Sequence, residues 1–280
     1  ALESVSLGQS LESIGDNAFE KCTNLKSITI PDSVSTIGQY AFAYCSNLQK
    51  VELPDTLQKI ADYLFYNCSK LEAISLPGSL QTIGSYAFYG CAITSLALPE
   101  TLTSIGSYAF QNCDDLEYVY IPDTVTNIKN YAFEYTCYCQ AESRPANWST
   151  YWNSSGTSYW GCILEDDFIY SIVNEDDGSS TLRLLSYVGQ ETDVVIPSTI
   201  KVGEESLTVT AIYDKAFYNS SVVSVTLPET ILSIGEEAFY NCHSLTTINL
   251  PSSLESIGRY AFFSCGALTS IFIPASVTSI

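Results

Sequence analysis

The sequence has few basic residues, one histidine and no methionine. Lys and Arg number 11 against 31 Asp and Glu, so the formal net charge at pH 7 is −20. A negative field of this size repels nucleic acid and anionic membrane surfaces, and we expect neither as a partner. No apolar run approaches the ~20 residues of a membrane-spanning helix. Because a gene product begins with Met, we expect Ala1 to be a processed or trimmed end, and the missing signal peptide says nothing about a longer protein.

The residue combinations that most enzymes need are also missing. His243 is the only histidine, so neither a catalytic triad nor a histidine metal site is predicted. No G-x-S-x-G, P-loop or H-E-x-x-H motif occurs. The adjacent carboxylates of Asp166–Asp167 and Asp176–Asp177 would point in different directions and do not fit the spacing of a calcium loop. We therefore expect no enzyme, no cofactor and no metal site, with a hydrolase as a distant third possibility.

What the sequence does contain is an internal repeat. A Phe residue, preceded by Ala in all units but one, returns every 23 residues, with two steps of 22 and one gap of 84. The repeated residues are Phe19, Phe42, Phe65, Phe88, Phe110, Phe133, Phe217, Phe239 and Phe262. A fixed period of about 20 to 50 residues is typical of solenoids and other repeat architectures.

The apolar pattern inside one unit predicts how the repeat folds. Each unit has about eight apolar positions that its own residues cannot cover, and stacking of identical units would bury them. Residues 25–31 alternate at period 2 and end at a Pro, which predicts a short strand, and residues 34–37 predict a second strand on the opposite face. Residues 16–22 are too short for a helix and predict a helical or 3-10 turn. The expected fold is a right-handed solenoid of mostly short parallel β-strands with such turns.

Glycine follows the second strand in most units. It stands at Gly38 and Gly84, for example, but Ala61, Lys129 and Tyr213 replace it elsewhere. A position that accepts a Cβ atom cannot require a left-handed backbone. We therefore predict that this Gly allows neighbouring coils to pack closely.

The repeated box I-G-x-x-A-F-x-x-C-x-x-L-x-x-I-x-I-P-x-S resembles the BspA-like leucine-rich repeats of bacterial cell-surface proteins. The resemblance covers residues 2–137 and roughly 193–280. Residues 139–152 resemble segments that close one array in this family, and residues 168–197 resemble the hairpin that opens the next. The resemblance implies a secreted or cell-surface protein used for adhesion. Some members of the family engage host extracellular-matrix proteins.

The repeat is interrupted once. We expect a first leucine-rich repeat array, an irregular aromatic-rich insert with a β-hairpin, and a second array truncated in mid-repeat, which comprise residues 1–137, 138–192 and 193–280. Within the insert, residues 168–173 and 182–187 alternate like strands, and the linker between them suits a hairpin turn. We expect the insert to break the ladder and to leave each array with its own core.

Seven of the ten cysteines occupy one slot of the repeat, three residues after the Phe: Cys22, Cys45, Cys68, Cys91, Cys113, Cys242 and Cys265. Thr136 and Ser220 fill the slot in the other two units. Thiols and hydroxyls share small size and hydrogen bonding, so a buried structural ladder of reduced thiols is predicted. The remaining Cys137, Cys139 and Cys162 allow either a disulfide between Cys162 and one of the other two, or free thiols.

Tyrosines form a ladder as well. Tyr40, Tyr63, Tyr86, Tyr108 and Tyr131 share the slot before Ala-Phe in five consecutive units. Stacking of the rings is the simplest interpretation, and a stripe that binds sugar or peptide is the alternative.

The outward positions of the first strand are small or polar until they change to Tyr118 and Tyr120, close to the aromatic insert. Tyr and Trp are frequent at binding hot spots. The candidate binding residues are therefore Tyr118, Tyr120, Tyr138, Trp148, Trp152 and Trp160. The competing interpretation is that the insert packs on the tyrosines and caps the array. We predict an adhesin or scaffold that binds a protein partner, such as a host matrix protein; a glycan-binding module that uses the aromatic insert is the alternative.

Overall fold

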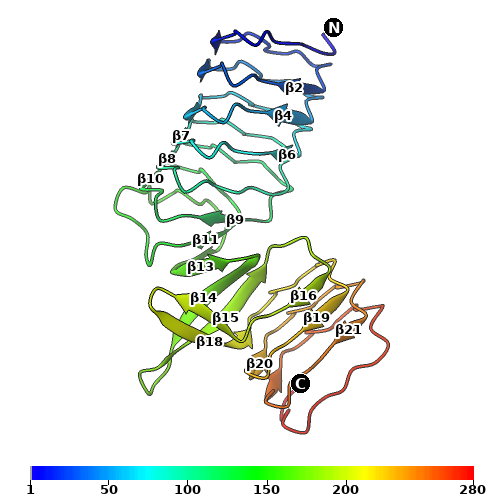
Figure 1. Ribbon diagram of the computed structural model, residues 1–280. Helices are drawn as coiled ribbons and strands as arrows, with labels where there is room; N and C mark the ends of the chain where they lie inside the picture. The colour runs from blue at the N-terminus through cyan, green and yellow to red at the C-terminus, as the bar shows by residue number, and fades with distance from the viewer. Residues whose placement is uncertain (1) are drawn as a thin grey trace. The chain divides into compact units, whose positions relative to one another are not determined.

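The computed structural model describes residues 2–280, which form short β-strands and turns and no helix. The chain divides into two compact units, Ala1–Trp160 and Gly161–Ile280 (Figure 1). Each unit is a stack of coils joined by parallel strand pairs, so the predicted parallel β-solenoid is confirmed.

Two ladders of parallel strands run along the first unit. One contains β2 (Ser27–Thr29), β4 (Lys50–Glu52) and β6 (Ala73–Ile74), and further along it β9 (Tyr118–Ile121), β11 (Thr136–Cys139) and β12 (Ser158–Tyr159). The other contains β1 (Ser13–Ile14) and β3 (Thr36–Ile37), followed by β5 (Lys59–Ile60), β7 (Thr82–Ile83), β8 (Ser104–Ile105) and β10 (Asn127–Ile128). The register places equivalent residues of consecutive units beside one another, as Ile60 beside Ile83. The 23-residue period therefore determines the register of both ladders.

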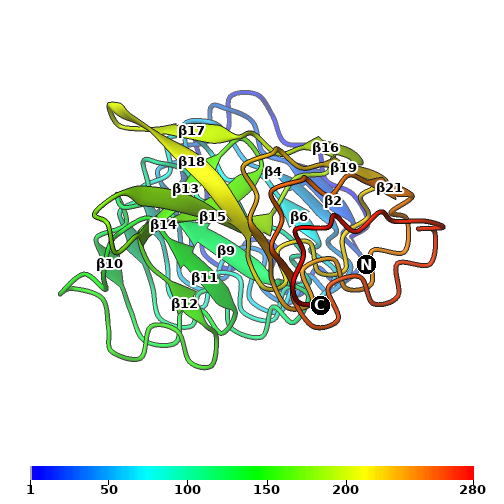
Figure 2. The same cartoon turned by 90° about the horizontal axis from the view of Figure 1, so that it is seen from below.

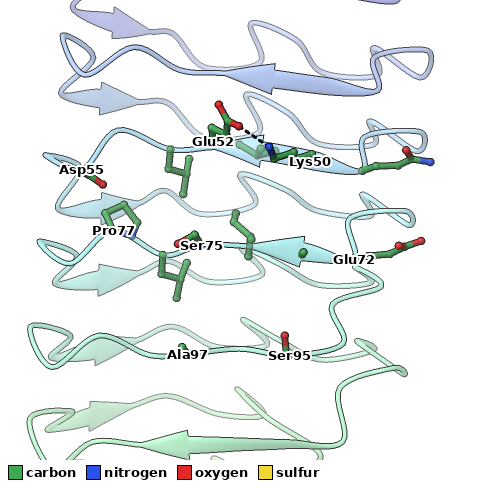
Figure 3. Close-up of a pocket in the computed structure, with 14 residues that line it drawn as sticks. Lys50, Glu52, Asp55, Glu72, Ser75, Pro77, Ser95 and Ala97 are labelled. Carbon is green, nitrogen blue, oxygen red and sulfur yellow. Dashed lines mark hydrogen bonds and ion pairs between the residues drawn. The ribbon is translucent and has the colours of Figure 1, made fainter. Parts of the chain in front are cut away.

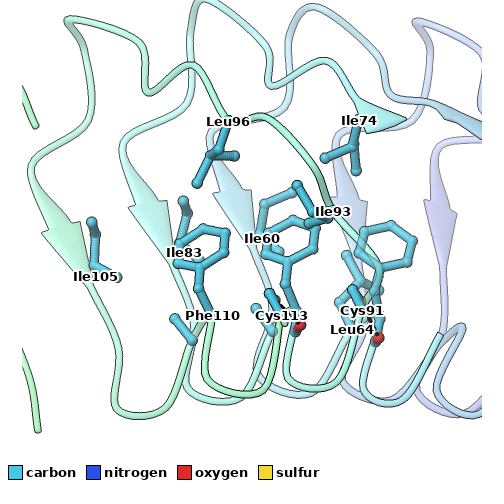
Figure 4. Close-up of a cluster of buried hydrophobic side chains, with 14 of the residues drawn as sticks. Ile60, Leu64, Ile74, Ile83, Cys91, Ile93, Leu96, Ile105, Phe110 and Cys113 are labelled. Atoms are coloured by element: carbon cyan, nitrogen blue, oxygen red, sulfur yellow. Dashed lines mark hydrogen bonds between the residues drawn. The ribbon is translucent and has the colours of Figure 1, made fainter. Parts of the chain in front are cut away.

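The core of the first unit lies between the two ladders. In Figure 4, Ile60, Ile83 and Ile105 point inward from one ladder. The repeated Phe residues stack through the middle with ring centroids 5.2 to 5.7 Å apart. Burying a side chain of this size stabilises the fold by about 1.5–3 kcal/mol, so the Phe stack is a main source of stability.

The predicted helical or 3-10 turns are wrong. Every second N–H in this segment bonds to the next coil, as Tyr63 does to the Ser85 carbonyl at 2.9 Å and Phe65 to the Ala87 carbonyl at 2.8 Å. The N–H groups between them close tight turns within the coil, as Leu64 does to Ala61. In a helix, the N–H groups beyond the first turn would all bond to carbonyls of the same segment. In most coils two residues take positive φ instead, one at the Tyr slot and one four residues later, as Tyr63 and Asn67 do.

The glycine slot serves close packing, as the sequence predicts. At Gly84 an added Cβ atom would lie 2.6 Å from the Asp62 nitrogen of the preceding coil, although its φ is not left-handed. Asp62 accepts a hydrogen bond from the Ser85 nitrogen at 2.8 Å across the same gap. The small residue therefore lets two backbones approach each other.

The second unit combines hairpins with coils. One sheet holds β13 (Cys162–Glu165), β14 (Phe168–Asn174), β15 (Ser180–Tyr187), β18 (Glu205–Ile212), β20 (Ser233–Ile234) and β22 (Ser256–Ile257), with β17 (Thr199–Val202) beside β18. The antiparallel pair of β17 and β18 is yellow in Figure 2. A parallel ladder contains β16 (Asp193–Val195), β19 (Ser224–Thr226) and β21 (Thr247–Ile248). This unit has a separate core, which includes Tyr170, Phe217 and Phe239.

The proposed insert, residues 138–192, is divided between the two units. Residues up to Trp160 extend the first unit by a further coil, because the N–H of Phe133 bonds to the Trp152 carbonyl at 3.1 Å and β12 pairs in parallel with β11. The hairpin of β14 and β15 belongs to the second unit. The stacking of coils therefore continues through Trp152, where we expected an interruption. The Trp152 ring packs against Phe133, the last repeated Phe of this unit, with ring centroids 6.2 Å apart.

Candidate functional site

In the first unit, the outward side of the ladder that contains β2, β4 and β6 is called the strand face. It carries a shallow hollow of about 800 Å³, which lies over β4, β6 and residues 95–97 of the next coil (Figure 3). Its floor consists of short outward side chains: Ala73, Ser75, Ser95 and Ala97. Side chains alternate along a strand, so the intervening Ile74 and Leu96 are buried in the core. Short side chains on neighbouring coils leave a depression in the surface.

Acidic side chains border the hollow. Glu52, Asp55 and Glu72 line it, with Lys50 as its one basic residue. The Lys50 Nζ lies 2.6 Å from the Glu52 Oε1, and the Thr29 hydroxyl donates to the Glu52 Oε2 at 2.8 Å. The hydrogen bond from Lys50, and then that from Thr29, hold the pKa of Glu52 below its ordinary value. The border therefore keeps negative charge at neutral pH and favours positively charged groups.

Tyrosines follow the hollow on the same face. Ala97 pairs with Tyr120 of β9, and Tyr118 and Tyr120 are half-buried there. The Tyr118 ring lies 6.2 Å from that of Tyr138, which stacks on Tyr159 at 5.3 Å. The structure thus brings three of the predicted binding residues together, but Tyr138 is only 8% exposed, so its assignment as a binding residue is corrected and Tyr118 and Tyr120 remain on the face.

The predicted tryptophans occupy a different place. Trp148 and Trp152 are 2% and 4% exposed and belong to the core of the first unit, so their assignment as binding residues is corrected. The Trp148 indole N–H donates to the Val125 carbonyl at 2.9 Å, which satisfies its polar atom inside the core. Trp160 packs against the same core while half-buried. At this end of the first unit, tryptophan rings take the place of the repeated Phe in the core. The sequence does not reveal this, because the 23-residue period ends before Trp148.

The repeat signature itself has a known counterpart. A family model described as the BspA type leucine rich repeat region matches the chain in six copies, over residues 1–113, 35–151 and 210–280. The chain belongs to this family. Leucine-rich repeat proteins of this architecture present extended surfaces to other molecules, and such a repeat protein suits protein interaction.

Solved structures of bacterial leucine-rich repeat proteins resemble this BspA-type protein. One from Bacteroides capillosus is 33% identical, with 42% of this chain and 87% of that chain covered and a TM-score of 0.39. One from Bacteroides ovatus is 26% identical, covering 96% and 78%, with a TM-score of 0.39. A leucine rich cell surface protein from Faecalibacterium prausnitzii is 27% identical, covering 97% and 67%, also with a TM-score of 0.39. A comparison with curated proteins finds no significant match.

The cysteines of the BspA-type repeats link neighbouring coils through hydrogen bonds of their thiols. Six of the seven thiols, all but Cys22, donate to the carbonyl of the Phe one coil earlier, as Cys68 does to Phe42 at 3.1 Å and Cys91 to Phe65 at 3.2 Å. Cys22 and Cys265 are half-buried, and the other five members of the ladder are buried. Burial raises the pKa of the Cys113 thiol to about 12 and that of Cys91 well above its ordinary value. Buried thiols with raised pKa values are poor nucleophiles.

The off-ladder cysteines are buried too. Cys137 is a free thiol, and its Sγ lies 3.5 Å from the Tyr135 carbonyl oxygen. A disulfide between Cys162 and Cys137 is therefore wrong for this structure, whereas pairing of Cys162 with Cys139 stays a prediction.

Thiol labelling of the native protein checks the ladder. We expect Cys68, Cys91 and Cys113 to resist maleimide in buffer and to react fully in denaturant, because burial withholds both access and the thiolate. Mass spectrometry of the labelled peptides measures the extent at each site. Rapid labelling of these three residues in the native protein would contradict the structural role.

Within residues 2–280 no group of three or more His, Cys, Asp or Glu side chains is arranged to hold a metal ion. That part of the chain also has no helix with the length and apolar character to cross a membrane.

Proposed function

We propose that this protein is an extracellular adhesin or scaffold, secreted or held at the cell surface, that binds a protein partner through the strand face of its first unit. The partner is of the kind found in host extracellular matrix. The observation that carries the proposal is the hollow over β4 and β6, with acidic borders and with Tyr118 and Tyr120 beyond it. Membership of the BspA-type family supports the location and the adhesive role.

The face suits an extended protein segment. The hollow is shallow and open, with a floor of four short side chains, so a peptide backbone could approach the sheet closely there. Basic side chains of the segment would meet Glu52, Asp55 and Glu72 at the border. Tyr118 and Tyr120 would then contribute contact area at little cost in side-chain entropy. Binding in this arrangement needs no reacting group, which favours recognition over catalysis.

Replacing Tyr118 and Tyr120 together with Ser is expected to weaken partner binding at least tenfold, on the order of the loss of a hot-spot residue. The measurement is surface plasmon resonance against immobilised matrix proteins, after a screen that includes a glycan array. A second variant, Ser75→Gln with Ala97→Gln, fills the hollow without removing a ring and should weaken binding as well. Both residues are exposed, so the melting temperature should change little.

The matched control is Val195→Ser. Val195 is 68% exposed on the strand ladder of the second unit, so the variant removes an outward apolar side chain away from the hollow. It should bind like the parent protein. If the Tyr118 and Tyr120 double variant and the Ser75 and Ala97 double variant both bound the partner like the parent protein, the proposal of binding through the strand face would be rejected. Binding to glycans alone, in the absence of any protein ligand, would favour the alternative of a glycan-binding module.

A further inference from the structure

The second unit has a small cavity of about 140 Å³. It is lined by the turn that joins β13 to β14, by the end of β15 and by the segment that leads into β16. Phe168 and Val194, each at most 7% exposed, form apolar walls. The Tyr187 ring completes them, with its centroid 5.3 Å from that of Phe168. A side chain that enters this cavity therefore meets an apolar surface.

Hydrogen bonds and close packing hold the segment after β15 at the border of this cavity. The Tyr187 hydroxyl donates to the Glu191 carbonyl at 2.9 Å. The Val188 N–H donates to the Asp167 carbonyl at 2.8 Å. At Gly189 an added Cβ atom would lie 2.6 Å from the Asp167 Cβ, so the missing side chain lets the segment pass close to this residue. The border is therefore built from segments that are fixed to each other.

The border of the cavity is strongly acidic. Four exposed carboxylates stand on it, those of Asp166, Asp167, Glu191 and Asp193. Within residues 2–280 the ion pairs join lysines to Glu20, Glu52 and Glu237, and none of these pairs includes a carboxylate of this border. Burial, and then the negative charge of Asp167, raise the pKa of Tyr187 above its ordinary value. The cavity therefore favours a positively charged group.

A buried hydroxyl near the same border has no partner. Tyr170 is fully buried, and among the described residues nothing forms a hydrogen bond with its hydroxyl. Burial raises the pKa of Tyr170, and the charges of Asp166 and Glu165 raise it further, so the hydroxyl lies close to the acidic turn. Buried polar groups normally have a hydrogen-bond partner, and a hydroxyl oxygen can accept a bond from an incoming donor. An ammonium group at the border would bring such donors to this part of the unit.

The arrangement of the carboxylates suits an organic cation. Within residues 2–280 no three acidic side chains are arranged to hold a metal ion, so the four of this border stand apart around the cavity. Lysine combines an apolar four-carbon stem with a compact ammonium group that carries three donors. An arginine guanidinium is planar and pairs best with a single carboxylate in a two-pronged contact. Apolar walls beneath separate carboxylates therefore fit lysine better than arginine.

We propose that this cavity is a second binding site, which takes one lysine side chain of a partner protein. The lysine stem lies against Phe168 and Val194, and its ammonium group lies among the carboxylates of Asp167, Glu191 and Asp193. The net charge of −20 attracts a basic partner at long range, and the cavity then selects the lysine at close range. The lining residues belong to the second unit, so this site does not depend on the strand-face hollow.

The test uses a fluorescent peptide with a single lysine between glycines and with blocked ends, at about 0.15 M salt to screen bulk charge. Fluorescence anisotropy measures its affinity. The same peptide with norleucine keeps the stem and lacks the charge, and it should bind at least about tenfold more weakly. The peptide with arginine in the same place should bind at least about threefold more weakly than the lysine peptide. Equal binding of either counterpart would overturn the proposal.

Replacing Asp167 with Asn and Glu191 with Gln removes two carboxylates of the border and should weaken binding of the lysine peptide about tenfold. The matched control is Asp176→Asn with Glu204→Gln. Both control residues are exposed in hairpin turns of the same unit, so this variant loses the same two charges while the cavity stays intact. It should bind like the parent protein. Equal affinity of the two double variants would overturn the proposal, because bulk charge alone would then explain binding.

Crosslinking of the unaltered protein provides a second measurement, which holds even where a variant folds poorly. A carbodiimide joins the lysine of the bound peptide to the carboxylates that it touches, and mass spectrometry should find the peptide on Asp167, Glu191 or Asp193. Attachment spread evenly over the acidic residues of the chain, or confined to the border of the strand-face hollow, would overturn the proposal. The Tyr118→Ser and Tyr120→Ser double variant should bind the lysine peptide normally, which separates this cavity from the hollow.

Discussion

At pH 10 the free energy of unfolding should be about 4 kcal/mol lower than at pH 8 because of three thiols alone, those of Cys68, Cys91 and Cys113. Each is at most 2% exposed. Burial raises the pKa of Cys113 from 9.0 to about 12 and raises those of Cys68 and Cys91 as well. The folded protein therefore keeps these protons while the unfolded chain releases them above about pH 9. The stabilisation is complete below pH 9 and is lost as the pH rises towards 12.

Changing the three residues to Ser separates this effect from the titration of tyrosines. Ser220 occupies the same slot in the second unit, where its N–H bonds to the Phe217 carbonyl at 3.0 Å as Cys242 bonds to Phe239 at 3.3 Å. A Ser hydroxyl does not ionise in this range, so the triple variant should lose about 4 kcal/mol less than the parent between pH 8 and pH 10. Urea unfolding followed by circular dichroism measures both slopes. Identical pH dependence of the two proteins would show that the thiols are accessible or ionise freely in the fold.

Replacing Phe88 with Ala should lower the free energy of unfolding by about 3–5 kcal/mol. Phe88 is fully buried and stacks between Phe65 at 5.4 Å and Phe110 at 5.2 Å. The substitution leaves a cavity in the middle of the ladder and removes contacts with both neighbouring coils. Since each coil of a solenoid is held by its neighbours, the damage should extend beyond one repeat.

Two further variants serve as comparisons for the decrease in the free energy of unfolding that Phe88→Ala causes. Phe88→Leu keeps most of the buried volume and should cost roughly 1.5 kcal/mol or less. Tyr44→Ala removes a ring that is 38% exposed and should cost clearly less than the core substitution. Urea unfolding at neutral pH gives all three values. A loss below about 1 kcal/mol for Phe88→Ala would mean that the Phe stack contributes little to stability.

The period alone determined the architecture. Because each unit repeats the same apolar positions, equivalent residues fall beside one another, and the Phe, Cys and Tyr ladders follow from the spacing. The prediction of Gly as a close-packing residue followed from the variation at that slot, with Ala61 and Tyr213 in place of Gly, and the Cβ distances at Gly84 agree with it. These features depend on which residue types recur at the same place in each repeat, and the sequence shows this directly.

The conformation of the turns and the place of the tryptophans depended on tertiary structure. The segment expected to be a helical turn gives every second N–H to the next coil, and no single unit contains that acceptor. Trp148 and Trp152 looked exposed because the period ends before them, yet the open end of the Phe stack buries them. The hollow arises from small residues on coils 22 residues apart in sequence, as Ala73 and Ser95 are. Stacking decides these features, because the hydrogen-bond partner, the covering side chain and the neighbouring wall each come from another coil.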